Sequence, residues 1–473
     1  MEIIRVYKIW IIIACLALGF SCSEDFMDKS PYASITNENA LGSYDKLVQS
    51  TKGLYPGLMG SNLYGQRMII APDVLADNIK FSNEATTSRY NQDYLLNLTD
   101  QNSPWTFSDA YYLITASCNI INAIDKGEFD RQTATDDQIN QILGEALFMR
   151  ALGHFTSVNF YAHHYTIEDA NVAPGADGNG GHLGIPIVLE TQIGEPARNT
   201  VKEVYDQVIN DLTRSVSLLN EKKAVYYVSP NVAKAFLARV YLYKEDYENA
   251  AKMANDVIQS GDYMLTPKDG YENYWKLADQ PETIFEVAMD FSDPDFEAGN
   301  NTVGGVYLYY KDVVSTDQLA NLYEDNDVRK LVLKPNGSGE YLIYKYPGRE
   351  GTDGVQVNNT KVIRLAEMYL IRAEGNEKAG TTIGDTPFND INFLRQERGL
   401  DELSVVDAAA IALERRLELA YEGFRIYDLA RYKADNVRPE CLPVPLVKYP
   451  DSRYVYKVPM HEVDNNVNMV QNP

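Results

Sequence analysis

Tryptophan, cysteine and histidine are scarce in this sequence of 473 residues, with three, four and five copies. Two of the cysteines, Cys15 and Cys22, lie in the first 22 residues, and the other two, Cys118 and Cys441, are far apart and make neither a disulfide framework nor a zinc site. The chain also lacks GxGxxG, GxxxxGK[ST], GxSxG and HExxH motifs, so nucleotide, serine-hydrolase and metalloprotease chemistry have no support. We therefore expect no cofactor, no metal and no enzymatic activity.

Basic residues are also few, at 43 Lys and Arg against 67 Asp and Glu, which gives a net charge of −24. That charge repels nucleic acid and favours solubility. The hydrophobic share of 45% is enough for a large core. Tyrosine is abundant at 34 copies, and its ring with a hydroxyl suits wet interfaces and ligand surfaces.

The N-terminus carries a targeting segment. Arg5 and Lys8 precede an apolar run that ends at Phe20 and is too short to span a bilayer. Cys22 follows directly after Ser21, which is the pattern for lipid modification, such as palmitate, on a new N-terminal cysteine. We predict a signal peptide over 1–21 and lipidation at Cys22. Cleavage before Cys15 and an ordinary secretory signal remain alternatives.

The stretch 230–261 predicts a helical hairpin. Ser229 and Pro230 suit a helix start, and Gly261 suits a helix end. Alanines on both helices allow close approach, and several positions follow the two-helix tetratricopeptide pattern of about 34 residues. One such hairpin cannot bury its own apolar face, so we expect other helices to stack on it.

The remaining chain divides into helical and irregular parts. Helical periodicity predicts a scaffold over 37–58, 105–265 and 361–432, whereas 61–104 and 266–360 are irregular with short strand-like runs. Val306 to Tyr310 is one of these runs, and as a strand it would place Tyr307 and Tyr309 on one face. Length alone would allow two or three domains.

Several motifs follow one another in a fixed order along the chain. They are Trp105 with Tyr112 and Asn122, GEALFMRALGHF (144–155), NVAKAFLARVYLYKEDYENA (231–250), ETIFEV (282–287), RLAEMYLIRAE (364–374), INFLRQERG (391–399), ERRLELAYEGFRIYDLARY (414–432) and a closing MVQNP. Together they resemble the SusD/RagB family of surface lipoproteins over almost all of the mature sequence. The loop 163–184 is longer than the corresponding turn of the family.

The resemblance implies a mostly α fold, with a tetratricopeptide-like helical hairpin scaffold and a loop-rich, partly β ligand-binding region in a single domain, 22–473. It implies a lipid-anchored protein at the cell outer membrane, facing outside. Such a protein captures oligosaccharide and delivers it to a partner TonB-dependent (SusC-like) transporter, over which it acts as a lid. A peptide-binding member of the family and a tetratricopeptide-type surface adaptor for other proteins are the alternatives.

Aromatic and planar polar side chains in the irregular segments are the ligand-binding candidates, because sugar recognition combines a flat ring with groups that pair hydroxyls. The candidate residues are Tyr64, Asp77, Asn78, Arg89, Tyr90, Tyr94, Phe291, Phe296, Tyr307 and Tyr309. Trp105 and Trp275 lie beside scaffold motifs, so we expect both to be structural and no tryptophan to be left for stacking.

Two groups of titratable residues have structural explanations that are simpler than a catalytic or metal-binding role. Glu414, Glu418 and Glu422 share one helical stripe, and an ion-pair network, with cations such as Arg415 and Arg425 near in sequence, is a better interpretation than catalysis. The histidines of 163–184 lack a metal-ligand motif, so we expect them in an exposed loop.

Overall fold

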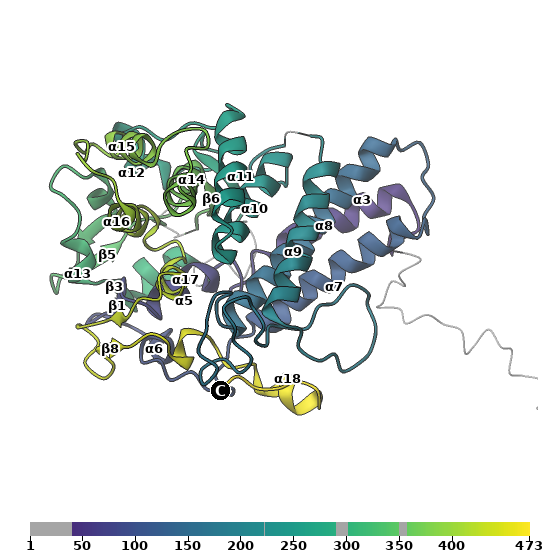
Figure 1. Cartoon of the computed structure of the whole chain (residues 1–473), viewed down its shortest axis with the longest axis horizontal. Helices are drawn as coiled ribbons and strands as arrows, with labels where there is room; N and C mark the ends of the chain where they lie inside the picture. Colours follow the sequence, from purple (N-terminus) through teal and green to yellow (C-terminus); the bar gives the residue numbers. More distant parts are fainter. Residues whose placement is uncertain (1–39, 222, 290–300, 350–356) are drawn as a thin grey trace, which may run out of the picture.

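Helices dominate the described chain, which covers residues 40–221, 223–289, 301–349 and 357–473 of a computed structural model (Figure 1). The α-helices are α3 (Tyr44–Lys52), α4 (Leu54–Gly57), α5 (Arg67–Val74), α6 (Asn91–Tyr94), α7 (Thr106–Asp125), α8 (Asp136–Tyr161), α9 (Val201–Leu218), α10 (Pro230–Lys244), α11 (Tyr247–Gln259), α12 (Tyr271–Tyr274), α13 (Asp317–Ala320), α14 (Leu365–Ala379), α15 (Pro387–Glu397), α16 (Ala408–Leu419), α17 (Arg425–Arg431) and α18 (Met460–Asn465). The mostly α-helical fold predicted from the sequence is confirmed.

The long helices stack in chain order. α7 packs on α8, α8 on α9, α9 on α10, α10 on α11 and α11 on α14, which in turn contacts α15 and α16. In Figure 1 this series runs from right to left, and the C-terminal segment with α18 crosses the bottom. Each hairpin thereby covers the apolar face of the next, as a helical-repeat scaffold requires.

The predicted hairpin forms as expected. Ser229 caps α10 by accepting from the Val232 amide at 3.4 Å, and α10 ends at Glu245 in the left-handed region. Gly261 has φ of 69° just after α11, a conformation that favours glycine. The facing side chains, including Ala238, Ala250 and Ala254, are fully buried.

Two glycines bring helices closer than any side chain would allow. A Cβ at Gly153 of α8 would lie 2.7 Å from Ile114 Cγ1 on α7. A Cβ at Gly375 of α14 would lie 2.6 Å from the Tyr247 carbonyl oxygen on α11. Both are sub-van-der-Waals separations, so these two helix contacts depend on glycine.

Short strands occupy the left-hand part of the molecule in Figure 1. They are β1 (Ile79–Phe81), β2 (Thr283–Val287), β3 (Val313–Ser315), β4 (Leu333–Pro335), β5 (Tyr341–Ile343), β6 (Thr360–Arg364), β7 (Asn436–Val437) and β8 (Leu446–Val447). One antiparallel sheet has the order β1-β3-β5-β4, and β2 pairs with β6 in a buried ladder beside α10. β2 lies within 266–360, where the sequence predicts short strand-like runs.

Two local predictions are wrong. Lys361 to Arg364 belongs to β6 rather than to the helix, because β2 offers it a backbone partner. Val306 to Tyr310 is not a strand but lies in η4 (Gly305–Tyr310), a π-helical turn. Over five residues the helical and strand periods cannot be distinguished, and here the tertiary contacts decide. Tyr307 is consequently buried, whereas Tyr309 is 59% exposed.

The remaining short elements are the 3₁₀ turns η3 (Lys268–Gly270), η5 (Val328–Val332) and η6 (Ser452–Tyr454). Among the described residues, no helix is both long and apolar enough to cross a membrane. The expected division into a signal peptide and a single mature domain stays a prediction, and Cys22 lies outside the described residues.

Candidate functional site

The predicted acidic stripe, of which Glu414 and Glu418 lie on α16 and Glu422 in the turn after it, belongs to a buried ion-pair network. Glu418 binds Arg398, Arg364 and Arg329, and Glu422 binds Arg364 and Lys345. Burial alone would raise the pKa of Glu418, but Arg398 and Arg364 lower it well below its usual range. An ion-pair network was predicted here, and all of these groups are buried away from any substrate.

The cations of this network come from distant parts of the chain. Arg415 and Arg425, which are near in sequence, pair instead with Asp428 and Asp77. The expectation that they neutralise the α16 stripe is therefore wrong. Proximity in sequence did not predict the ion-pair partners, because the side chain of Arg415 on α16 reaches Asp428 on α17, and that of Arg425 on α17 reaches Asp77.

Two of the polar ligand candidates are fixed inside the protein. Asp77 is 5% exposed and pairs with Arg425 Nε at 2.6 Å, and Arg416 also contacts it. Burial would raise the pKa of Asp77, but these two arginines lower it. Asn78 is 1% exposed and donates to Asp73 at 2.7 Å. Neither side chain presents a free polar group to a ligand at the surface.

Most of the tyrosine candidates also point inward. Tyr64, Tyr90, Tyr94 and Tyr307 are each less than a tenth exposed, so no flat ring face is open to solvent. Tyr90 donates its hydroxyl to Gln66 at 3.0 Å, and Tyr94 donates to the Glu440 carbonyl at 3.1 Å. The remaining aromatic candidates, Phe291 and Phe296, lie outside the described residues.

Two of the predicted residues, Arg89 and Tyr309, each contact Tyr310. The guanidinium carbon of Arg89 lies 3.7 Å from the centre of the Tyr310 ring. The rings of Tyr309 and Tyr310 are edge to face, with centroids 5.0 Å apart. We call Arg89, Tyr309 and Tyr310 the tyrosine–arginine cluster. It joins the two irregular segments through residues that are more than 200 positions apart in sequence.

The backbone around the cluster is held tightly. Thr86 donates from both its amide and its hydroxyl to the Tyr310 carbonyl, at 3.1 and 2.8 Å. Thr87 donates its amide to buried Asp312 at 2.8 Å, and its hydroxyl binds the same carboxylate. Tyr90 and Lys311, which flank the cluster, both have positive φ, a strained conformation for these residues. Strain of this kind, together with a π-helical turn, is common at functional sites.

Polar groups surround the cluster. Glu84 accepts from the Ser338 amide at 2.8 Å and lies 3.5 Å from Lys311 Nζ. Hydroxyl, amide and charged groups beside exposed rings are what binding of a sugar requires. Tyr310 was missed from the sequence because a strand would have turned it away from Tyr309, whereas both can be exposed on a helical turn.

Trp105 is a further correction. It is 60% exposed at the start of α7 and stacks on His461 at 4.7 Å, so it is not a core residue. Tyr112, two turns along the same helix, is 74% exposed. Trp275, in contrast, is 1% exposed and buried among tyrosines, as predicted. A tryptophan is therefore available at the surface after all.

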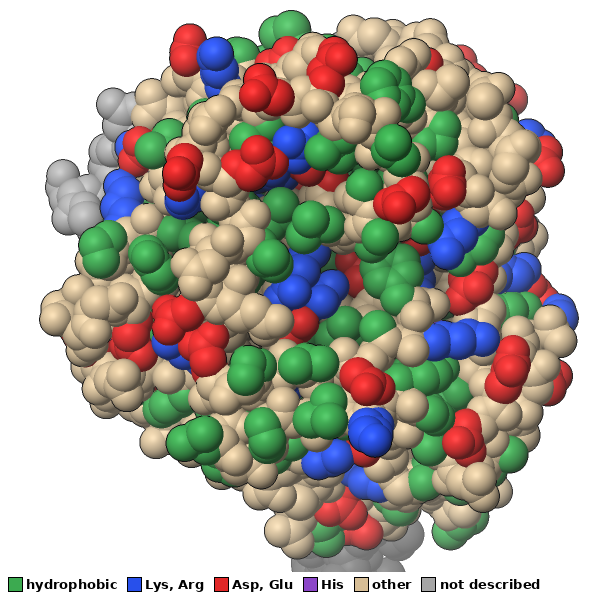
Figure 2. Space-filling model, turned by 60° about the vertical axis from the view of Figure 1, so that its left-hand side comes forward, with side chains coloured by type: hydrophobic (Ala, Val, Ile, Leu, Met, Phe, Trp, Pro, Cys, Tyr) green, Lys and Arg blue, Asp and Glu red, His purple; other side chains and the backbone are tan. Residues whose placement is uncertain are grey.

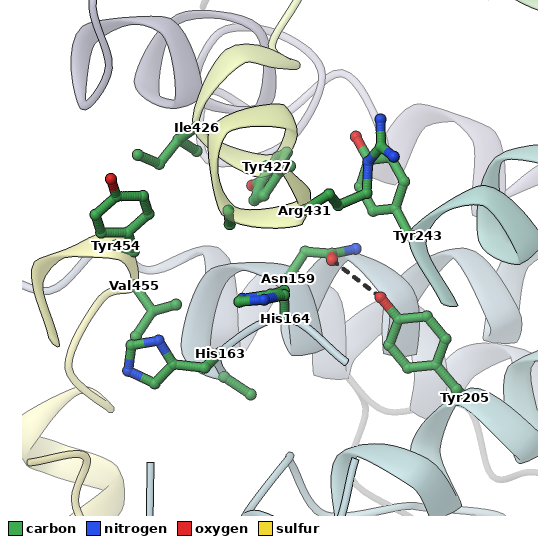
Figure 3. A pocket seen from close by; sticks show the side chains of 12 residues that line it. Asn159, His163, His164, Tyr205, Tyr243, Ile426, Tyr427, Arg431, Tyr454 and Val455 are labelled. Atoms are coloured by element: carbon green, nitrogen blue, oxygen red, sulfur yellow. Dashed lines mark hydrogen bonds between the residues drawn. The ribbon is translucent and has the colours of Figure 1, made fainter. Parts of the chain in front are cut away.

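The histidines of the loop 163–184 were expected to be exposed, but they are not. His163 and His182 are 5% and 2% exposed, and His182 Nε2 lies 2.9 Å from the His163 carbonyl oxygen. His163 and His164 line a cavity with Tyr205 and Arg431 (Figure 3). Burial lowers the pKa of both histidines to about 3. The cavity, of about 20 Å³, has room for one water molecule and none for a nutrient.

Larger hollows lie on the scaffold. A groove of about 390 Å³ between α3, α8 and the segment before α10 is lined by Tyr44, Lys52, Gln138 and Tyr227.

Among the described residues no group of His, Cys, Asp and Glu is arranged to hold a metal ion. Figure 2 shows a face where acidic, basic and hydrophobic side chains are interspersed around a hollow, without a large area of one charge.

Comparison with known proteins agrees with this arrangement of a helical-hairpin scaffold and irregular segments. A family model described as "Starch-binding associating with outer membrane" matches residues 25–242, and the SusD family model, SusD_RagB, matches residues 302–473. The chain belongs to the SusD family. The first description associates such proteins with the outer membrane.

Individual relatives are distant but cover most of the chain. A SusD-like protein of Bacteroides ovatus is 23% identical, over 90% of this chain and 83% of its own length. A SusD superfamily structure from Bacteroides thetaiotaomicron has a TM-score of 0.81 at 27% identity, covering 91% of this chain and 100% of its own. A putative sugar binding protein from Bacteroides vulgatus has a TM-score of 0.81 at 26% identity, covering 92% and 99%.

Proposed function

We propose that this protein captures oligosaccharide at the cell surface and delivers it to a partner TonB-dependent transporter of the outer membrane, acting as its lid. The tyrosine–arginine cluster carries the proposal. It offers Tyr309, 59% exposed, beside a guanidinium and a polar rim. Sugar rings stack on aromatic side chains of this kind, and the hydroxyls of the sugar pair with planar polar groups.

Membership of the SusD family supports a glycan as the ligand. Two structural neighbours are described as a laminarin-binding SusD-like protein and a surface glycan-binding protein A from Bacteroides fluxus. Each is 20% identical to this chain, with a TM-score of 0.72, so they share its fold. Binding without chemical conversion of the ligand is part of the proposal, because the acidic stripe is engaged in buried ion pairs.

Attachment to the membrane is also part of the proposal. Lipidation of Cys22 would anchor the protein to the membrane through its N-terminus. The family resemblance supports the transporter partner and the outward orientation.

An affinity-gel screen followed by calorimetry tests the ligand. The probes are laminarin, starch, xylan and pectin, and the variants are Tyr309→Ala and Tyr310→Ala. Loss of an exposed stacking ring should weaken binding by about 1–3 kcal/mol. Tyr112→Ala, which removes an exposed tyrosine from α7, is the matched control and should bind as the unmodified protein does. Binding of a glycan that survives both cluster substitutions would contradict this site.

The groove lined by Tyr44 and Tyr227 favours the second candidate, an adaptor that binds a peptide or another protein. It lies on the helical scaffold and combines rings with Lys52 and Gln138. If a peptide library binds and Tyr227→Ala abolishes that binding, while no glycan binds, the adaptor function replaces the glycan function.

A further inference from the structure

Arg89 has no carboxylate partner among the described residues, and unlike Arg198 and Arg438, which also lack one, it does not donate to a set of backbone carbonyls instead. No carboxylate of the described residues lies within ion-pair distance of it, and its one side-chain hydrogen bond goes to Thr87 Oγ1 at 3.1 Å. Its other N–H groups meet no acceptor among those residues. By comparison, Arg364 and Arg398 each bind two or three carboxylate groups.

The guanidinium is nonetheless held in place. It is partly exposed, stacks on Tyr310 at 3.7 Å and binds Thr87, which is itself fixed on Asp312. Stacking holds the plane of the guanidinium, and the bond from Nη1 fixes its direction. Little side-chain entropy is then lost when an acceptor binds the free edge. A guanidinium edge presents two parallel N–H donors, whose spacing matches a carboxylate or sulfate.

The neighbouring charges do not neutralise this edge. Asp312 is fully buried, and both of its oxygens are engaged by Thr87. Glu84 faces Lys311 and the Ser338 amide instead. Asp312 and Glu84 thus have partners of their own, and no carboxylate of the described residues forms an ion pair with the guanidinium.

We propose that the glycan bound at the tyrosine–arginine cluster carries an anionic substituent, a carboxylate or a sulfate, which the free edge of Arg89 binds. The inference rests on the proposed function and narrows its substrate class to acidic glycans. Tyr309 would stack on the ring next to the charged group. Because the net charge of −24 repels dense polyanions, isolated acidic residues in the glycan fit this surface better than a continuous charged chain.

The test compares acidic oligosaccharides with their neutral counterparts. The pairs are a galacturonate tetrasaccharide with its methyl ester, and a sulfated galactose tetrasaccharide with its desulfated form. Calorimetry is run on the unmodified protein, on Arg89→Gln, on Arg89→Lys and on Arg131→Gln. The last variant removes the same charge from an exposed arginine that pairs with Asp136, so it controls for net charge.

We expect at least one acidic member to bind about 10- to 100-fold more tightly than its neutral partner, the range for a charge-assisted, two-point hydrogen bond. Arg89→Gln should abolish that ratio and leave binding of the neutral partner unchanged. Arg89→Lys should keep part of the affinity ratio, because lysine retains the positive charge but lacks the two parallel N–H donors. Arg131→Gln should keep the whole ratio. Melting temperatures of the variants exclude unfolding as the cause of a loss. The pair that shows the ratio distinguishes carboxylate from sulfate.

Equal binding of acidic and neutral members, with a dependence on Tyr309, would overturn the acidic-glycan inference and leave the proposed function standing. An acidic peptide that binds through Arg89 in preference to every glycan would also overturn it. No glycan binding to the unmodified protein, together with unchanged melting, would count against the proposed function itself.

Discussion

Glu418 and Arg398 form a two-point ion pair that is fully buried. Arg398 Nε donates to one carboxylate oxygen at 2.9 Å, and Nη2 donates to the other at 2.9 Å. Glu282 completes the pair from the β2 side, 3.2 Å from the same guanidinium. This contact joins α16, the end of α15 and the β2–β6 ladder, so it connects the helical scaffold to the irregular segments.

Glu418→Gln should destabilise the protein by about 3–5 kcal/mol, because Arg398, Arg364 and Arg329 would lose a shared negative charge without access to water. The midpoint of urea denaturation measures the change. Glu248→Gln breaks an exposed pair with Lys252 on α11 and is the control, which should shift the midpoint little. Equal shifts in the two variants would show that burial does not set the cost.

Trp275→Ala should cost about 3–5 kcal/mol, because it empties a fully buried site beside Tyr271 and Tyr274. Trp105→Ala should cost less than about 1 kcal/mol, since its ring is mostly exposed and stacks on His461. Thermal melting of both variants measures the contrast. A large loss of stability in Trp105→Ala would support the structural role expected from the sequence.

Ala238→Leu should destabilise the α10–α11 hairpin by about 1–3 kcal/mol, because the added atoms have no space in a fully buried contact. Ala409→Leu, at an exposed position of α16, is the matched control. An unchanged melting temperature in Ala238→Leu would be incompatible with the close approach of the two helices.

The buried histidines should make stability depend on pH. Burial and then Arg150 lower the pKa of His154 to about 3, against an ordinary value of 6.5. As pH falls from 6.5 toward 3, the histidine takes up a proton in the unfolded state but not in the folded state. The contribution of His154 to the free energy of unfolding is therefore complete above pH 6.5 and decreases between pH 6.5 and pH 3. His154 alone should lower the free energy of unfolding by about 2 kcal/mol between pH 7.5 and pH 5.

His154→Gln tests this, because the amide oxygen can still accept from the Val188 amide, which lies 3.3 Å from His154 Nε2. Denaturation at the two pH values should show a difference about 2 kcal/mol smaller than in the unmodified protein. Asp73 acts in the opposite sense, since burial raises its pKa to about 6, but it is present in both proteins and cancels. An identical pH dependence in both would mean that His154 takes up its proton at the same pH in the folded and the unfolded protein.

Cys22→Ala should release the protein into a soluble fraction or leave it unprocessed, because the apolar run before Cys22 is too short to hold a membrane as a helix. Fractionation with labelled palmitate measures this. Ser23→Ala leaves the cysteine intact and is the control. A Cys22→Ala protein that is still processed and membrane-bound would favour one of the alternative signal segments.

The local sequence was enough to predict the scaffold. Ser229, Pro230 and Gly261 mark the ends of one hairpin, and the spacing of buried residues in α9 follows one helical face. The helix over 136–161 was also predicted, although it is buried on all sides rather than on one face. These features depend on contacts between near neighbours, which the chain order itself specifies. The glutamates of α16 were also correctly assigned to ion pairs, although not to the right arginines.

The candidate site depended on tertiary structure. Arg89 and Tyr309 were both predicted, but the sequence could not show that both contact Tyr310, because more than 200 residues separate Arg89 from the two tyrosines. Nor could it separate them from Tyr90 and Tyr307, their near neighbours, which are buried. Adjacent tyrosines have the same intrinsic preference for a half-buried surface. Which of them reaches solvent is decided by the turn at η4 and by the side chains that pack beneath it, and these come from the whole fold.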